Sequence, residues 1–315
     1  MPDKKRVAVL MGGRSAERDV SLSTGKQIAE SLDRGKYDVV PLDTDDLPRL
    51  AAAAGGERPD IVFIALHGPG GEDGTVQGFL EVLNIPYTGS GVLASALAMD
   101  KVKCKALLST ENIWMPADVV FHRGDAPRLR RASAEVERQL GFPVIVKPSR
   151  QGSTYGCTVV DEAAGLNEAL RFAFRYDDTA LVEQRIVGTE ITVAVLGNRQ
   201  PSPLPVVEIV PPNGFFDYQA KYAESGAEEI VPARIPEAAA EEATEIALRC
   251  HRLLGCRGMS RTDMFVTDDG VVTLEVNTIP GMTPTSLLPK AARAAGIAFP
   301  ALLDGLIALA LEKSP

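Results

Sequence analysis

The residues whose chemistry is most readable lie near the end of the chain, on either side of Asp268-Asp269-Gly270. This tripeptide is typical of a hairpin loop, with glycine where a left-handed backbone is required. If it forms the loop, Asp263 lies opposite Glu275 on the neighbouring strand. The same register places Arg261 opposite Asn277. Because side chains alternate between the two faces of a strand, we expect these four polar residues to share one face.

Two carboxylates that face each other across a ladder repel unless a cation lies between them. Carboxylate and amide oxygens suit Mg²⁺, whose coordination is usually completed by substrate phosphates. The spacing alone supports a magnesium site and a solvated polar face with an incidental Arg–Asp pair equally well. The same register pairs Thr267 with Val271 and directs Val272, Leu274 and Val276 into a core.

A second candidate is the loop of small residues at 148–156, which follows a predicted strand at 142–147. Small residues let backbone N–H groups approach anionic oxygens, and Lys147 at the strand end would add a positive charge. The phosphate-loop motif G-x-x-x-x-G-K-[ST] does not occur in the chain. Taken alone, the loop is more simply interpreted as a flexible turn, and Lys101 as an ordinary surface lysine.

The amino-terminal part of the chain predicts elements that would position such groups. Strands are predicted at 6–11, 37–42 and 60–66, with a helical stretch that continues through Lys36 and a short helix at 47–54. This β-α-β-α-β order implies a parallel sheet with right-handed crossovers, whose ligands gather at the carboxyl ends of the strands. Gly12-Gly13 and the loop 67–74 both lie at such ends.

The later part of the chain favours an α+β arrangement with more antiparallel strands. Helices are expected at 92–110, 162–174 and 237–254, and strands at 157–160, 180–186, 191–196, 206–210, 262–266 and 271–276. The connection between Pro212 and Pro232 is long, poor in strand signals and rich in aromatic residues, which is typical of a lid over a site.

The composition describes an ordinary globular chain of 315 residues, with 33 Lys+Arg against 42 Asp+Glu and a net charge of -9. That charge argues against a nucleic acid or an anionic membrane as the main partner. The four cysteines form no C-x-x-C pair, which fits a reducing compartment without a disulfide framework or zinc knuckle. No run of ~18 apolar residues predicts a membrane span. We therefore expect a cytoplasmic protein.

Several motifs, taken together and in chain order, resemble the D-alanine–D-alanine ligase family of the ATP-grasp superfamily. They are GGRSAERDVS (12–21), HGPGGEDG (67–74), MDK (99–101), VKPSRQGS (146–153), FDYQAKY (216–222) and EVNTIPGMT (275–283). The resemblance covers essentially the whole chain. It implies a combined α/β and α+β architecture, in which an ATP-grasp fold follows an N-terminal parallel-sheet (preATP-grasp) domain. The expected divisions are 1–88, 89–187 and 188–315, the last carrying the metal site and the lid loop.

The resemblance also implies a reaction. ATP phosphorylates the carboxylate of a first D-alanine, and the amine of a second D-alanine then displaces the phosphate. The product, D-alanyl-D-alanine, serves peptidoglycan synthesis. Such chemistry requires cations on the migrating phosphoryl group, donors on the oxyanion and exclusion of water from a hydrolysable acyl phosphate.

Roles in nucleotide and metal binding follow by similarity. The implied ligands of two Mg²⁺ (or Mn²⁺) ions are Asp263, Glu275 and Asn277, with Glu275 bridging them. The implied contacts of the ATP phosphates are Lys101, Lys147 and Lys221. The implied contacts of adenosine are Glu183, the backbone at Ile186, and Glu190.

Roles toward the two amino acids also follow by similarity. Glu17 holds the first ammonium, with His67 nearby and hydrogen bonds to Ser153 and Tyr222. The oxyanion hole consists of Arg261 and the N–H of Gly281, and the second carboxylate is received by Ser286 and the N–H of Leu287. Taken alone, Glu17 is also a favourable acid at a helix start, and His67 an ordinary loop histidine.

A few residues depart from the family pattern or bear on specificity. Phe216 stands where relatives often carry tyrosine, Met259 where a larger aromatic residue occurs, and Tyr155 is unusually bulky for its loop. Tyr222 favours D-alanine as acceptor, because family members that make D-alanyl-D-lactate tend to carry histidine in this lid.

Two other functions remain possible from the sequence. The first is another ATP-grasp carboxylate–amine ligase, for example one that forms D-Ala-D-Ser or D-Ala-D-lactate. The second is a nucleotide-binding regulatory protein without turnover, although binding alone does not require an oxyanion donor such as Arg261. A homodimer is implied by the resemblance.

Overall fold

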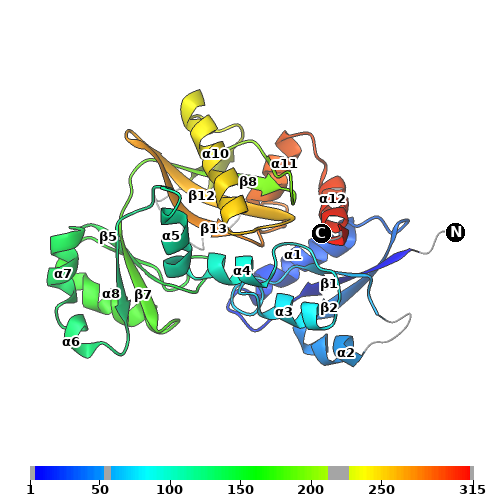
Figure 1. Cartoon of the computed structure of the whole chain (residues 1–315), viewed down its shortest axis with the longest axis horizontal. Helices are drawn as coiled ribbons and strands as arrows, with labels where there is room; N and C mark the ends of the chain where they lie inside the picture. Colours follow the sequence, from blue (N-terminus) through cyan, green and yellow to red (C-terminus); the bar gives the residue numbers. More distant parts are fainter. Residues whose placement is uncertain (1–3, 53–57, 212–226, 313–315) are drawn as a thin grey trace.

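The computed structural model describes residues 4–52, 58–211 and 227–312. Its strands form three sheets, one parallel and two antiparallel. In Figure 1 the amino-terminal sheet lies at the lower right, the central sheet at the left, and the largest sheet above and between them. The predicted combination of α/β and α+β parts is therefore confirmed.

The first sheet contains β1 (Lys5–Met11), β2 (Tyr37–Asp43) and β3 (Ile61–Ile64) in the order β2-β1-β3, with both pairs parallel. Around it lie α1 (Arg18–Ser31), η1 (Thr44–Asp46), α2 (Leu47–Ala52) and α3 (Thr75–Val82). The helix predicted to continue through Lys36 ends at Ser31 instead. The carbonyl of Asp33 accepts the N–H groups of Lys36 and Tyr37, so a turn replaces the last helical residues.

The central sheet has the order β4-β7-β5-β6, and all its pairs are antiparallel. Its strands are β4 (Asp118–His122), β5 (Val144–Pro148), β6 (Thr158–Val160) and β7 (Thr179–Gln184). The accompanying helices are α6 (Ala126–Leu129), α7 (Ala132–Gln139), η3 (Ala163–Gly165) and α8 (Leu166–Ala173). Apolar residues of α7 and α8, including Val136 and Leu170, share a buried core with Phe121 and Val146 of this sheet.

The single helix predicted at 92–110 is in fact two helices, α4 (Val92–Met99) and α5 (Lys101–Ser109). Asp100 separates them in an extended conformation, and its side chain accepts the N–H of Lys103 at the start of α5. Aspartate at this position satisfies an N–H group that has no partner within the helix. The break matters because it places Lys101 in the first turn of a new helix.

The third sheet follows the order β11-β10-β8-β12-β13, with β9 paired to β8. Its strands are β8 (Thr189–Leu196), β9 (Ser202–Pro203), β10 (Val207–Val210), β11 (Glu228–Ile230), β12 (Met259–Thr267) and β13 (Gly270–Asn277). The helix α10 (Glu237–Leu253) packs against one face of this sheet. The strand β11 lies within the connection that was predicted to be poor in strands, and it pairs with β10.

The last two helices, α11 (Leu287–Ala294) and α12 (Phe299–Leu311), join the core of the amino-terminal sheet. Leu288 of α11 and Leu303 of α12 are fully buried there. In the described residues no single helix is long and apolar enough to cross a membrane. These two helices pass that test only as a pair, which is bent by 104°.

The β12–β13 hairpin has the predicted pairing at its functional end but a different turn. Thr267 pairs with Gly270 rather than Val271, so the loop contains two residues instead of three. An irregularity after Asp263 then skips Leu274, which restores the pairing of Asp263 with Glu275. Such a bulge turns a side chain toward the other face of the sheet. Leu274, predicted to enter the core, therefore lines a cavity beside Asp263, whereas Val272 and Val276 are buried as predicted.

Helix α1 packs so closely on β1 that a side chain at Gly25 has no room. A Cβ atom there would lie 2.5 Å from Met11 Cβ. We expect Gly25→Ala to lower the free energy of unfolding by about 1–3 kcal/mol, because overpacking displaces the helix.

The matched control is Gly305→Ala in α12, where no atom lies within 4 Å of the new Cβ. Alanine is the better helix former, so this variant should be neutral or slightly stabilised. Urea unfolding of both variants measures the effect, and equal stability of the two would contradict the close packing of α1.

Candidate active site

Two cavities adjoin at the β12–β13 hairpin. The first lies among the loops that follow β1 and β3, the loop at 152–153, and the start of α11. The second lies between the central sheet and the third sheet. Glu275 lines both cavities, so the hairpin forms their shared wall.

One end of the first cavity carries a buried carboxylate. Glu17 precedes α1 and is 3% exposed, and it accepts a short hydrogen bond from Ser153 Oγ. Ser153 has a positive φ of 45°, so the loop adopts a conformation uncommon for a residue with a side chain in order to make this contact. A Cβ atom on Gly152 would lie 2.8 Å from Glu17 Oε2, which explains glycine at this close approach. The loop of the central sheet thus contacts the start of α1 in the amino-terminal part of the chain.

His67 and Glu72 line the same end of the cavity. Burial, assisted by the positive charge of Arg261, lowers the pKa of His67 to about 4, so the imidazole is neutral near pH 7. Its Nε2 lies 3.1 Å from Thr24 Oγ1. Burial, together with the nearby carboxylate of Glu17, raises the pKa of Glu72 to about 8. Glu72 accepts the N–H of Gly68 at 2.7 Å, which holds the glycine loop in place.

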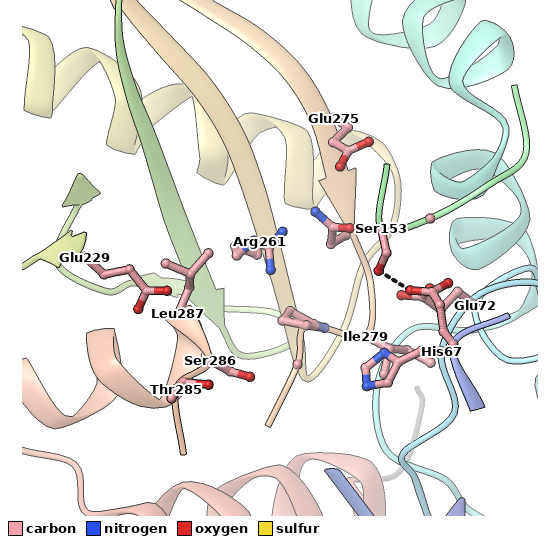
Figure 2. A pocket seen from close by; sticks show the side chains of 15 residues that line it. His67, Glu72, Ser153, Glu229, Arg261, Glu275, Ile279, Thr285, Ser286 and Leu287 are labelled. Atoms are coloured by element: carbon pink, nitrogen blue, oxygen red, sulfur yellow. Dashed lines mark hydrogen bonds between the residues drawn. The ribbon is translucent and has the colours of Figure 1, made fainter. Parts of the chain in front are cut away.

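Figure 2 shows Arg261 between this acidic end and a second group of side chains around Ser286 and Leu287. Ser286 immediately precedes α11, and its Oγ accepts the N–H of Thr283 at 3.0 Å. The N–H groups at the start of a helix favour an anion. Glu229 of β11 also lines this end and forms an ion pair with Lys290. The cavity therefore has a carboxylate at one end and a helix start at the other.

The four polar residues predicted to share a face of the hairpin lie together. Arg261 donates two hydrogen bonds to Asp263, at 2.8 and 2.7 Å. Asp263 also accepts from Thr192 Oγ1 at 2.6 Å and from Asn277 Nδ2 at 3.1 Å. Glu275 lies 3.3 Å from Lys101 Nζ. Cations thus surround the facing carboxylates, as their repulsion requires.

The donor set of this face fits a hard divalent cation whose coordination is completed by a further anion. Asp263, Glu275 and Asn277 present carboxylate and amide oxygens, and no group of three His, Cys, Asp or Glu side chains converges on a metal position in the residues described. Protein oxygens alone would therefore leave the coordination incomplete, and phosphate oxygens commonly complete it for Mg²⁺. Asp263 would have to exchange its Arg261 contacts for the cation.

The second cavity combines lysines with acceptor groups. It is lined by Lys101, Lys147, Glu183, Ile186 and Glu190, among others. Lys147 contacts Glu183 in a short ion pair. Burial alone would lower the pKa of Lys147, but the carboxylates of Glu183 and Glu275 outweigh it and raise the pKa, so the lysine keeps its charge.

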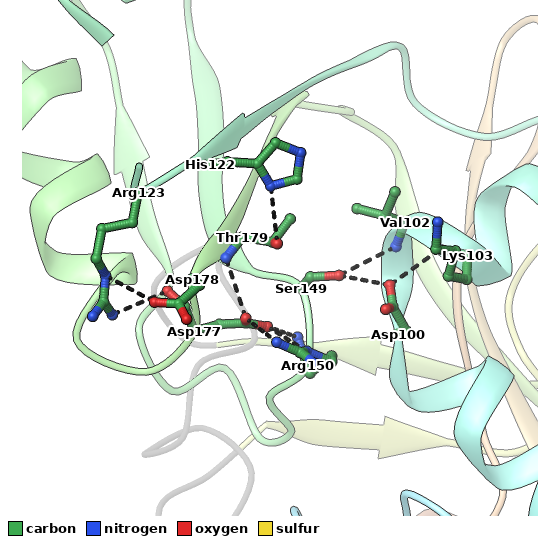
Figure 3. Close-up of polar contacts among 10 residues, drawn as sticks. All are labelled: Asp100, Val102, Lys103, His122, Arg123, Ser149, Arg150, Asp177, Asp178 and Thr179. Carbon is green, nitrogen blue, oxygen red and sulfur yellow. Dashed lines mark hydrogen bonds and ion pairs between the residues drawn. The ribbon is translucent and has the colours of Figure 1, made fainter. Parts of the chain in front are cut away.

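The loop between β5 and β6 is anchored by a polar network, which Figure 3 shows. Asp177 accepts the backbone N–H of Arg150 at 2.8 Å and the guanidinium of the same residue at 2.7 and 3.1 Å. Ser149 Oγ donates to Asp100 at 2.8 Å, and the N–H of Lys101 donates to the Ser149 carbonyl at 3.1 Å. One network therefore positions the loop and the first residue of α5 together.

The described site residues predicted from the sequence all line one of the two cavities. Lys221, Tyr222 and the rest of the predicted lid lie outside the described residues. No role was predicted from the sequence for three charged residues near the site, namely Glu72, Lys105 and Glu229. Lys105 had a signal in the sequence, because it follows Lys101 by one helical turn.

Solved structures with the same arrangement cover almost the whole chain. The D-alanine–D-alanine ligase from Bacillus anthracis complexed with ATP is 35% identical, with a TM-score of 0.82 over 98% of this chain and 97% of that one. The VanG D-Ala:D-Ser ligase from Enterococcus faecalis is 34% identical, with a TM-score of 0.85 over 98% of this chain and 100% of that one. The fold shared with these solved ligases places the chain in the ATP-grasp class of ligases.

The sequence relatives narrow this class to one family. The family model "D-ala D-ala ligase C-terminus" matches residues 107–308, and "D-ala D-ala ligase N-terminus" matches 6–49 and 47–90. A D-alanine–D-alanine ligase from Desulforudis audaxviator is 47% identical over 98% of this chain and 99% of the relative. A D-alanine–D-alanine ligase from Pelotomaculum thermopropionicum is 47% identical over 98% of this chain and 97% of the relative. The chain belongs to the D-alanine–D-alanine ligase family.

The raised pKa of Glu72 predicts a pH dependence of stability. Its ordinary value is 4.5, so the unfolded chain releases this proton at lower pH than the folded one. The folded state therefore loses stability as pH rises from about 4.5 to 8. Glu72→Gln keeps an acceptor for Gly68 but does not titrate.

We expect the melting temperature of Glu72→Gln, relative to wild type, to rise between pH 5 and pH 8. Glu137→Gln, at an exposed position of α7, is the control and should follow wild type. A difference between Glu72→Gln and wild type that is constant with pH would show that Glu72 does not bind the proton.

Proposed function

We propose that the protein joins two D-alanines to D-alanyl-D-alanine at the expense of ATP, through a D-alanyl phosphate. The observation that carries the proposal is the shared wall of the two cavities at Glu275. One cavity offers groups for an ammonium and a carboxylate, and the other offers lysines and acceptors suited to a nucleotide. Membership in the D-alanine–D-alanine ligase family supports the same reaction.

The reaction has two steps. A carboxylate oxygen of the first D-alanine attacks the γ-phosphorus of ATP, and the bond to the β-phosphate oxygen breaks to release ADP. The amine nitrogen of the second D-alanine then attacks the acyl carbon, and the C–O bond to phosphate breaks. The nitrogen loses a proton as the peptide bond forms, and the departing phosphate takes it up as hydrogen phosphate.

The first cavity supplies the groups that these steps require. Glu17, oriented by Ser153, would hold the ammonium of the first D-alanine, and neutral His67 would lie beside it. Arg261 and the N–H of Gly281 would stabilise the oxyanion, since donors in a cavity are worth more there than in water. Ser286 and the N–H of Leu287 would receive the second carboxylate at the start of α11.

The second cavity would bind ATP. Lys101 and Lys147 would contact its phosphates, Glu183 and the Ile186 backbone its adenine, and Glu190 its ribose. Lys221 and Tyr222 remain predictions for the lid. Two Mg²⁺ (or Mn²⁺) ions would be held by Asp263, Glu275 and Asn277. When bound, they would neutralise charge on the phosphates.

The biological setting belongs to the same proposal. The product would enter peptidoglycan synthesis, and the enzyme would act in the cytoplasm as a homodimer. Gel filtration with light scattering measures the oligomeric state directly.

The acceptor is tested by supplying ATP, Mg²⁺ and D-alanine, with D-alanine, D-serine or D-lactate as the second substrate. We expect D-alanine-dependent phosphate release and a dipeptide as the main product, because the chain is 47% identical to a D-alanine–D-alanine ligase over 98% of its length. Chromatography identifies the product. Depsipeptide formed from D-lactate as readily as dipeptide would refute this specificity.

Replacing Glu275 tests whether its carboxylate, in the wall shared by the two cavities, is required for turnover. Glu275→Gln keeps the shape but removes the charge that the proposed cations require, so turnover should fall by roughly a hundred-fold or more. Glu241→Gln, at an exposed position of α10, should retain the wild-type rate. Circular dichroism should show the same fold for both variants. Near-full activity of Glu275→Gln would mean that the metal assignment is wrong.

A further inference from the structure

Lys105 of α5 is a buried lysine with a complete set of partners. It is 8% exposed, and its ammonium donates to the Pro116 carbonyl at 2.7 Å and to Glu183 Oε1 at 2.6 Å. Asp118 Oδ1 lies 2.8 Å from the same nitrogen. An ammonium group has three N–H donors, and three acceptors surround this one. Lys105 therefore has no donor left for a ligand.

Lys105 lies beside two carboxylates of the central sheet that would otherwise repel each other. Asp118 of β4 and Glu183 of β7 lie directly opposite each other in the antiparallel register. Like charges at such positions destabilise a sheet, and the Glu183 side chain is only 3% exposed. Lys105 contacts both carboxylates from the neighbouring helix, so it compensates the repulsion between them and, above all, the charge of the buried Glu183.

Glu183 has two lysine partners, but they differ in their access to the cavity. Lys147 contacts Glu183 Oε2 and lines the second cavity, where the proposed phosphates would attract it. Lys105 contacts Oε1 and, among the described residues, is not part of the cavity wall. Burial alone would raise the pKa of Glu183, yet the two lysines together lower it. The partner that a bound nucleotide leaves in place is Lys105.

We propose that Lys105 is a positioning residue that sets the base selectivity of the nucleotide site by holding Glu183 as an oriented, ionised acceptor. An ionised carboxylate only accepts hydrogen bonds. At the cavity wall it therefore favours a purine with an exocyclic amino group and disfavours one with a carbonyl oxygen there. The inference rests on the proposed function, in which the second cavity binds ATP.

The same helix connects both ends of the nucleotide site. Lys101 opens α5 beside Glu275, and Lys105 lies one turn later on the same face, behind Glu183. The break at Asp100 starts this helix, so one local feature places a cation for the phosphates and a cation for the base-reading carboxylate.

The test compares ATP with inosine triphosphate, whose base carries a carbonyl oxygen in place of the amino group. The variants are Lys105→Met and, as a matched control on the same helix, Lys103→Met at an exposed position. We expect Lys105→Met to raise KM for ATP and to lower the ATP/ITP ratio of kcat/KM, each by about ten-fold. KM for D-alanine should change by less than about two-fold, and Lys103→Met should match wild type.

The ratio does not depend on how much of a variant folds, because both nucleotides are assayed on the same preparation. An unchanged ratio in Lys105→Met, with ATP turnover intact in wild type, would overturn this inference alone. No D-alanine-dependent ATP turnover in wild type would overturn the proposed function and this inference with it.

A second comparison separates holding Glu183 from general support of the sheet. Glu183→Gln can donate to a carbonyl oxygen and should also lower the ATP/ITP ratio. Adding Lys105→Met to Glu183→Gln should leave the ratio unchanged, because the carboxylate is already gone. A further fall in the double variant would show that Lys105 acts through another group and would overturn the proposal.

Discussion

Asp263 and Glu275 face each other across the β12–β13 ladder, and their repulsion constrains much of the surrounding structure. Arg261 neutralises one of them from within β12, and Lys101 approaches the other from the start of α5. Because these cations belong to different elements, the hairpin and α5 have to meet at this point. The two cavities meet there as well, with Glu275 in both walls. An arrangement that concentrates negative charge is suited to binding a cation together with an anion that brings further oxygens.

A second constraint is the joining of segments distant in the sequence. Glu17 lies at the start of α1 and Ser153 in the loop between β5 and β6, and the hydrogen bond between them lies at one side of the first cavity. The network around Asp177 holds that loop at its base, and Asp100 ties it to α5. The first cavity is thus assembled from segments that lie far apart in the chain.

Much of the architecture was predictable because the spacing of apolar residues and the residue types in turns are local properties of the sequence. The parallel sheet at the start of the chain follows from the alternation of strands and helices. The face of the hairpin that carries Asp263 and Glu275 follows from the alternation of side chains along each strand. The pairing of Asp263 with Glu275 was predicted correctly, but from a three-residue loop that does not form. The actual loop is one residue shorter, and the bulge at Leu274 shifts the register back by one residue. The division at Asp100 was not predicted, because both helices share one continuous apolar pattern. Only the extended Asp100, whose side chain accepts the N–H of Lys103, separates them.

The sequence by itself determined the family, the types of chemical groups available and the elements that carry them, since these depend on residues close in the chain. Only the tertiary structure decided which groups act together. Lys105 of α5 meets Asp118 of β4 and Glu183 of β7, and Glu229 of β11 meets Lys290 of α11. Such pairings depend on the burial of charge between distant segments, and no spacing along the chain specifies that burial.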